Sequence, residues 1–111
     1  MTDEEQEAQN IMMEMQQVQG QLQQVTVQKE ETESELQGIE KSLDELDEEE
    51  DGSVYKSVGN ILVQKDREDL IEEMEDKKET LEVRMDSLST KEERLQEKMQ
   101  EIQGKFAEMQ G

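Results

Sequence analysis

Several residue types are absent from this sequence, and each absence narrows what the chain can do. Among 111 residues there is no cysteine, histidine, proline or tryptophan, and there is one tyrosine and one phenylalanine. Without cysteine and histidine, disulfide bonds, thiolate catalysis, imidazole metal ligands and histidine general bases are excluded. The shortage of aromatic side chains argues against a compact monomeric globule. The absence of proline favours long, uninterrupted helices.

Acidic side chains dominate the charge of the chain. Asp and Glu number 32 against 12 Lys and Arg, which gives a formal net charge of -20. Nucleic acid and anionic membranes would be repelled by such a surface, so neither is expected as a partner. The first five residues lack the pattern of a secretion signal, and no apolar run approaches the roughly 20 residues that cross a bilayer. We therefore expect a soluble, cytoplasmic protein.

A regular apolar pattern runs through the first half of the chain. The steps between its positions alternate between four and three residues, and the residues in between are mostly Gln and Glu. The positions are Ile11, Met15, Val18, Leu22, Val25, Lys29, Thr32, Leu36, Ile39, Leu43 and Leu46. A period of 3.5 sustained over this length predicts a coiled-coil helix, assigned to residues 5–48, and argues against disorder.

A second series with the same spacing occupies the end of the chain. Its positions are Ile71, Met74, Lys78, Leu81, Met85, Leu88, Glu92, Leu95, Met99, Ile102, Phe106 and Met109. It predicts a second coiled-coil helix over residues 66–110, with Asp66 as its N-cap and Glu68 and Asp69 in its first turn. Both apolar lines are narrow, so each helix is expected to pack against one main partner.

Four positions of the two series are polar: Lys29, Thr32, Lys78 and Glu92. One interpretation is an arm that opens at these points. The other, which we prefer, is that polar positions select the register of the two helices, with their charged ends reaching solvent.

Residues 53–65 have a different pattern. Here lies the one cluster of β-branched and aromatic residues, and Gly59-Asn60 is a two-residue turn signal with glycine first, which predicts a β-hairpin. The acid run 47–51 and Gly52 are expected to end the first helix. The predicted register pairs Val58 with Ile61, and it leaves apolar residues on both faces of the hairpin.

A two-stranded hairpin is marginally stable by itself and exposes two strand edges, so this one is expected to assemble with other chains. The residues assigned to assembly are Val54, Tyr55, Val58, Gly59, Ile61, Leu62 and Val63. The predicted fold is mainly α: residues 1–111 form a single domain, an antiparallel coiled-coil helical hairpin with an inserted two-stranded β-hairpin that oligomerises into a β-barrel hub.

The hairpin segment also carries a resemblance. Val54-Tyr55-Lys56-Ser57-Val58-Gly59, followed by Ile61-Leu62-Val63, resembles the hairpin signature of β-class prefoldin subunits. Residues 78–84 resemble the start of their second arm, and a single hairpin is typical of the β class, since α-class subunits have two. The chain departs from the family in its heavy acid run at 47–51 and in ending at Gly111 without an extended tail.

The resemblance implies an ATP-independent chaperone. Two α-class and four β-class subunits would join through their hairpins into a double β-barrel from which six coiled-coil arms project. The arm tips would hold unfolded polypeptides and deliver them to a group II chaperonin, with no nucleotide or other cofactor.

Apolar residues near the two termini are candidates for client binding, because the two ends of an antiparallel helical hairpin lie together. Methionine is flexible and polarizable and suits promiscuous apolar binding. Met12 and Met13 lie off the regular series and are expected to be partly exposed. Met74, Met85 and Met99 lie on the series and are expected only to pack between the helices. The candidate residues are Ile11, Met12, Met13, Met15, Ile102, Phe106 and Met109.

No catalytic or metal site is predicted, and the chain is not expected to be an enzyme. Residues 47–58 partly match an EF-hand loop, but Val58 stands where a bidentate Glu is required. There is no glycine-rich phosphate loop. Two alternatives stay open: a structural coiled-coil spacer or dimerisation scaffold without client binding, and a substrate-positioning arm of an enzyme. The inserted strands argue against the first, and the short acidic chain argues against the second.

The resemblance is to archaeal subunits, and the excess of acidic residues suggests a halophilic source, because molar salt shortens the Debye length to about 3 Å and screens self-repulsion. We expect the melting temperature to be higher in molar KCl than in dilute buffer. Thermal unfolding followed by circular dichroism checks this, and equal melting temperatures in the two conditions would contradict it.

Overall fold

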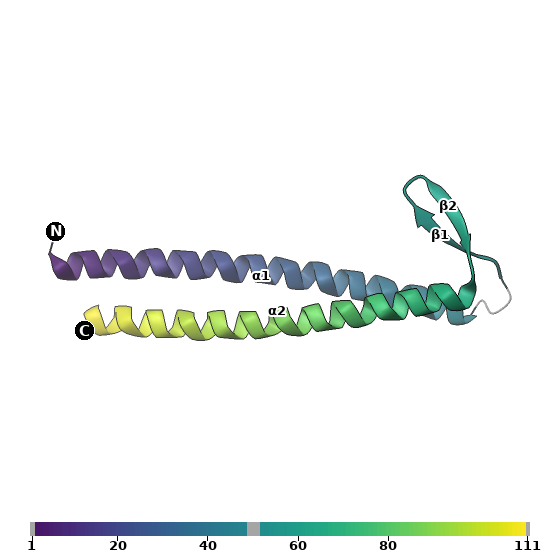
Figure 1. The fold of residues 1–111 in the computed structure, drawn as a ribbon. Helices are drawn as coiled ribbons and strands as arrows, with labels where there is room; N and C mark the ends of the chain where they lie inside the picture. The colour runs from purple at the N-terminus through teal and green to yellow at the C-terminus, as the bar shows by residue number, and fades with distance from the viewer. Residues whose placement is uncertain (1, 49–51, 111) are drawn as a thin grey trace. The chain divides into compact units, whose positions relative to one another are not determined.

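The computed structural model describes residues 2–48 and 52–110. Helix α1 spans Asp3–Glu48, strand β1 spans Val54–Val58, strand β2 spans Ile61–Lys65 and helix α2 spans Arg67–Gln110 (Figure 1). The predicted order of helix, hairpin and helix is confirmed. Residues 49–51 of the predicted acidic stretch lie outside the described residues.

Each helix begins at a side chain that caps its free backbone N–H groups. Thr2 Oγ1 accepts a hydrogen bond from the Glu5 N–H at 3.2 Å. As a result α1 begins two residues before the predicted start. Asp66 Oδ1 accepts hydrogen bonds from the N–H groups of Glu68 at 2.9 Å and Asp69 at 3.3 Å, so the predicted N-cap of α2 is confirmed.

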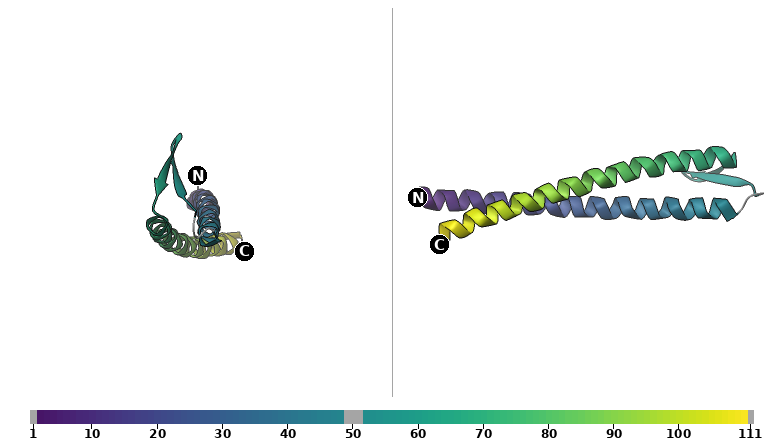
Figure 2. Two further views of the ribbon diagram at one scale, coloured as in Figure 1. Left: turned by 90° about the vertical axis from the view of Figure 1, so that its right-hand side faces the viewer. Right: turned by 90° about the horizontal axis from the view of Figure 1, so that it is seen from below.

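The chain packs as two units, and both helices contribute to each. We call Met1–Glu30 with Asp86–Gly111 the terminal unit, and Glu31–Met85 the hairpin unit. In the terminal unit the start of α1 lies beside the end of α2 (Figures 1 and 2), so the helices are antiparallel there. Its core consists of Ile11, Val18, Val25, Leu95, Met99 and Ile102, with Met15, Leu22, Leu88 and Phe106 packed against it.

The apolar periodicity identified the buried side of both helices. Every position of the first series is buried or half-buried, and so is every position of the second series from Ile71 to Phe106. Met109, in the last turn of α2, is 37% exposed. Leu70, which the series passed over in favour of Ile71, is buried as well. The spacing thus predicts the packed face within each helix and is less accurate at helix ends.

The two strands pair in the predicted register, with Val58 opposite Ile61 and Lys56 opposite Val63. Gly59 has a φ of +60°, and no non-glycine residue among 2–48 and 52–110 has a positive φ. A turn with positive φ at its first central residue alone is type II′, which matches the right-handed twist of the flanking strands.

Replacing Gly59 with alanine should loosen the hairpin, because a side chain at this φ costs roughly 1–2 kcal/mol. Faster amide hydrogen exchange in β1 and β2, with unchanged helix content, is the expected result. Gly20→Ala is the matched control: a Cβ at this helical glycine meets nothing within 4 Å. Alanine there should stabilise α1 by up to about 1 kcal/mol. Equal hairpin exchange in the Gly59→Ala variant and the parent would contradict the assigned turn.

Candidate functional site

The hairpin exposes four large apolar side chains, which we call the hairpin surface. Tyr55 is 54%, Val58 49%, Ile61 62% and Leu62 71% exposed. The register places Val58 and Ile61 on one face and Tyr55 and Leu62 on the other. Each face therefore carries two exposed apolar side chains. Covering a side chain of this size contributes on the order of 1–2 kcal/mol, so a partner that covers both faces would be strongly favoured.

The remaining hairpin residues predicted for assembly have other positions. Val54 and Val63 are half-buried, and Gly59 forms the turn. The sheet contains only these two strands, so each strand has one unpaired edge. Free edges accept further strands by backbone hydrogen bonding. The hairpin thus offers an incoming chain both apolar side chains and backbone groups.

Two cationic side chains fix the base of the hairpin. Lys56 Nζ donates a hydrogen bond to Glu73 Oε1 and so ties β1 to α2. Arg67, the first residue of α2, donates to the Leu46 carbonyl of α1 from Nε at 3.0 Å and from Nη2 at 2.5 Å. The last turn of α1 contains no basic residue of its own. Arg67 therefore supplies the positive charge that a helix C-terminus favours.

A pocket of about 570 Å³ lies beside these contacts, within the hairpin unit. Ile39, Leu46, Leu70 and Met74 of the helices and Val54 of β1 provide its apolar lining. The hydrogen bond of Lys56 and the half-buried side chain of Val54 both lie at the hairpin base, and in Figure 1 the hairpin projects sideways from the beginning of α2.

A second group of exposed apolar side chains lies near the chain ends, in the terminal unit. We call Met12, Met13 and Met109 the tip surface; they are 52%, 66% and 37% exposed. The prediction that Met12 and Met13 are partly exposed is confirmed. Lys29 lies opposite Glu92, and this antiparallel register places Met109 at the level of Met12. The three methionines therefore occupy the same end of the unit.

The other four residues predicted for client binding are covered. Ile11 and Ile102 belong to the core of the terminal unit, at 7% and 2% exposure, and Met15 and Phe106 pack against that core. They face the opposite helix because they lie on the regular apolar series. For them to touch a client, the helix ends would have to separate.

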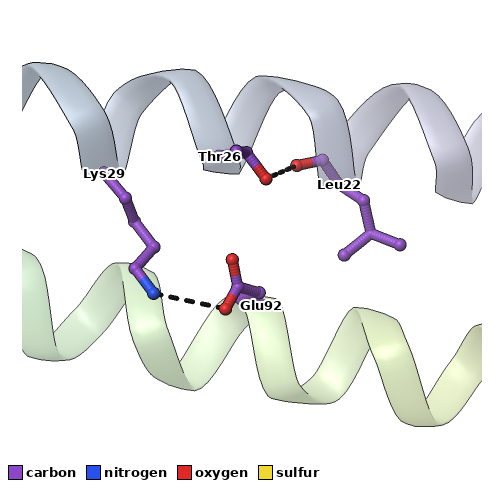
Figure 3. A network of polar contacts seen from close by, with 4 residues as sticks. All are labelled: Leu22, Thr26, Lys29 and Glu92. Carbon is purple, nitrogen blue, oxygen red and sulfur yellow. Dashed lines mark hydrogen bonds and ion pairs between the residues drawn. The ribbon is translucent and has the colours of Figure 1, made fainter.

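Three of the four polar positions in the two apolar series, Lys29, Lys78 and Glu92, pair with a charge on the opposite helix. Lys29 Nζ of α1 lies 3.2 Å from Glu92 Oε1 of α2 (Figure 3). In the hairpin unit, Lys78 Nζ lies 3.8 Å from Glu40 Oε1. Thr32 is 4% exposed. The ion pairs Lys29–Glu92 and Lys78–Glu40 are partly solvated, and each contributes at most about 1 kcal/mol to stability.

The same pairs fit a role in register selection. A shift of α2 by one heptad would place Lys29 opposite Met99 and leave its charge against the apolar core. The cost of desolvating an unpaired ammonium group then disfavours the shifted register.

Neither a metal site nor a membrane span is found in the part of the chain that the structure describes. Residues 2–48 and 52–110 contain no cluster of three acidic side chains positioned to hold a metal ion. Neither helix has a window apolar enough to cross a bilayer. Most of the acids of the partial EF-hand match, at 49–51, lie outside the described residues.

Two helices packed antiparallel, with an exposed apolar β-hairpin inserted between them, define the class of the protein. The prefoldin subunit family matches residues 9–111, and this chain belongs to that family. The chain is similar to the prefoldin β subunit from Thermococcus strain KS-1, at 35% identity over 90% of this chain and 89% of that chain, with a TM-score of 0.82. A comparison with curated proteins gave no match. The family assignment makes the chain a chaperone-type subunit, and subunits of this family assemble with one another.

The Lys56–Glu73 contact should be visible in a titration. The hydrogen bond from Lys56, and the nearby charges of Lys56, Lys65 and Lys77, hold the pKa of the Glu73 carboxyl below its ordinary value of 4.5. A lowered pKa means that the contact is fully present above this value and is lost as the pH falls through the lowered pKa. We expect Lys56→Met to raise the Glu73 pKa, measured by NMR of the carboxyl carbon.

Lys91→Met, in the terminal unit, is the matched control and should leave the Glu73 pKa unchanged. The same Glu73 pKa in the Lys56→Met variant and the parent would rule out the contact between β1 and α2.

Proposed function

We propose that this chain is a β-type subunit of an ATP-independent holding chaperone. It assembles with α-type prefoldin subunits into a hexamer of two α and four β chains, holds unfolded polypeptides at the tip surface, and delivers them to a group II chaperonin. The observation that carries the proposal is the exposure of Met12, Met13 and Met109 at the chain ends of a prefoldin-family subunit. The acidic composition further suggests the cytoplasm of a halophilic archaeon.

Assembly is assigned to the hairpin surface. Tyr55, Val58, Ile61 and Leu62 are the large exposed apolar side chains of the hairpin unit apart from Val83. They lie on strands with free edges. A neighbouring subunit that adds its own hairpin satisfies the edge by backbone hydrogen bonds and covers both apolar faces. Closure of several hairpins into a barrel removes the free edges altogether.

Client holding is assigned to the tip surface. Methionine side chains are unbranched and polarizable, so they adapt to apolar segments of different shape. Three partly exposed side chains bind weakly in a single arm. Several arms that engage one unfolded chain raise the overall affinity without any new contact, because each further binding event is intramolecular.

Weak individual contacts also suit delivery to a chaperonin. A client that is held by several arms can leave them one at a time, and each step requires little energy. Tight binding at one deep site would slow this release. The tip surface is partly exposed, which supports transient holding in preference to storage.

Both assignments are tested on the chain mixed with an α-type prefoldin subunit. The tip variant is Met12→Gln, Met13→Gln and Met109→Gln, the hairpin variant is Leu62→Lys, and Val83→Gln is the control at a similarly exposed apolar position (64%) outside both surfaces. Mass is measured by sedimentation, and suppression of aggregation is measured without nucleotide on a client diluted from denaturant.

We expect the tip variant to form the hexamer but to require roughly tenfold more protein for half-suppression, because the three changes together remove on the order of 1–2 kcal/mol of apolar burial. The hairpin variant should fail to assemble, and the control should match the parent. Unchanged suppression by the tip variant would exclude client binding at this surface. A parent chain that forms only a dimer and protects no client would favour the spacer alternative.

A further inference from the structure

The exposed methionines are also the side chains of this protein that oxidants can most readily reach. The sequence has no cysteine, tryptophan or histidine, and it has eight methionines. Oxidation by peroxides therefore falls on thioethers, since no thiol or indole competes for the reagent.

Exposure differs sharply among these methionines. Met12 and Met13 are 52% and 66% exposed, and Met109 is 37% exposed, whereas Met99 is buried at 8%. Met15, Met74 and Met85 are half-buried, and Met1 lies outside the described residues. All exposed methionines of residues 2–48 and 52–110 thus belong to the tip surface.

The surroundings of Met13 leave its side chain open to solvent. Neighbours on a helix surface lie three and four residues away. For Met13 these are Gln9, Asn10, Gln16 and Gln17, all of them exposed polar residues. No apolar side chain one turn away can cover Met13.

We propose that Met12, Met13 and Met109 form an oxidation-sensitive modification site that controls client binding. Peroxide converts their thioethers to sulfoxides and turns the tip surface from apolar to polar, so that its affinity for unfolded chains falls. This inference rests on the proposed holding function. It adds a reversible control to that function, because methionine sulfoxide is returned to methionine by thiol-dependent reductases.

The chemistry is a two-electron oxidation at sulfur. A sulfur lone pair attacks one peroxide oxygen, a sulfur–oxygen bond forms, and the oxygen–oxygen bond breaks. The departing hydroxide takes the proton from the transferred oxygen and leaves as water. Sulfur is oxidised and the peroxide is reduced, with one sulfoxide and one water formed for each thioether and each hydrogen peroxide consumed.

Burial limits the consequence to the tip surface. Met99 lies in the core of the terminal unit, where a sulfoxide would disrupt packing, and its 8% exposure protects it. No methionine belongs to the hairpin surface. Limited oxidation should therefore leave the helices and the assembly intact while it changes the surface that holds clients.

The test treats the purified chain with limiting hydrogen peroxide, removes the reagent, and only then adds the α-type partner and the client. We expect peptide mapping to find sulfoxide first at Met12, Met13 and Met109, with hexamer mass and helix content unchanged. The concentration for half-suppression should rise by roughly tenfold. A thiol-dependent methionine sulfoxide reductase should restore it.

Two variants localise the effect. Met12→Leu, Met13→Leu and Met109→Leu together remove the oxidisable atoms from the tip surface, so the ratio of treated to untreated suppression should be one. Met74→Leu with Met85→Leu is the matched control and should keep the full peroxide effect.

The outcomes separate this inference from the function on which it rests. If the untreated parent protects no client, the holding function is wrong. If the parent protects clients and peroxide oxidises the tip methionines without changing suppression, the modification site is wrong. Loss of the hexamer on oxidation, earlier oxidation of Met99, or an equal peroxide effect in the leucine variant would also overturn it.

Discussion

The packing of one line of apolar side chains on α1 against one line on α2 is the interaction on which the rest of the molecule depends. In the terminal unit this contact forms a core from six buried residues. A core so narrow holds two helices together but covers no side chain that lies off the two apolar series. Apolar residues off the seam, such as Met12 and Met13, therefore stay exposed. The same limit applies to the hairpin, whose two faces cannot both be covered by two helices.

Polar residues give this contact its register. A nearly uniform apolar line would tolerate shifts by a heptad, because one aliphatic side chain replaces another at little cost. Lys29 opposite Glu92, and Lys78 opposite Glu40, remove that freedom. Register matters for function because it sets which residues share a level at the chain ends. The antiparallel register of Lys29 opposite Glu92 places Met109 at the level of Met12.

The positive charge at the C-terminal end of α1 comes from α2. The last turn of α1 lacks a basic residue, and Arg67 of α2 supplies one through its two hydrogen bonds to the Leu46 carbonyl. Lys56 and Glu73 add a contact between the first strand and α2. These contacts hold the base of the hairpin while its apolar surfaces stay uncovered.

The sequence by itself determined the helices, the buried side of each helix, the strand register and the turn. These depend on local spacing: a 3.5-residue period, alternation in a strand, and a glycine that accepts a positive φ. The spacing also predicted that Met12 and Met13 are exposed, but only the tertiary structure showed that the other four client-binding candidates near the chain ends are covered: Ile11, Met15, Ile102 and Phe106. Ile11 and Met12 are equally apolar, yet one is buried and the other is not, because the antiparallel partner covers one side of the helix. The contacts of Arg67 and Glu73 were also visible only in the tertiary structure. Their partners, Leu46 and Lys56, lie 21 and 17 residues away along the chain, and no local sequence pattern marks such a pair.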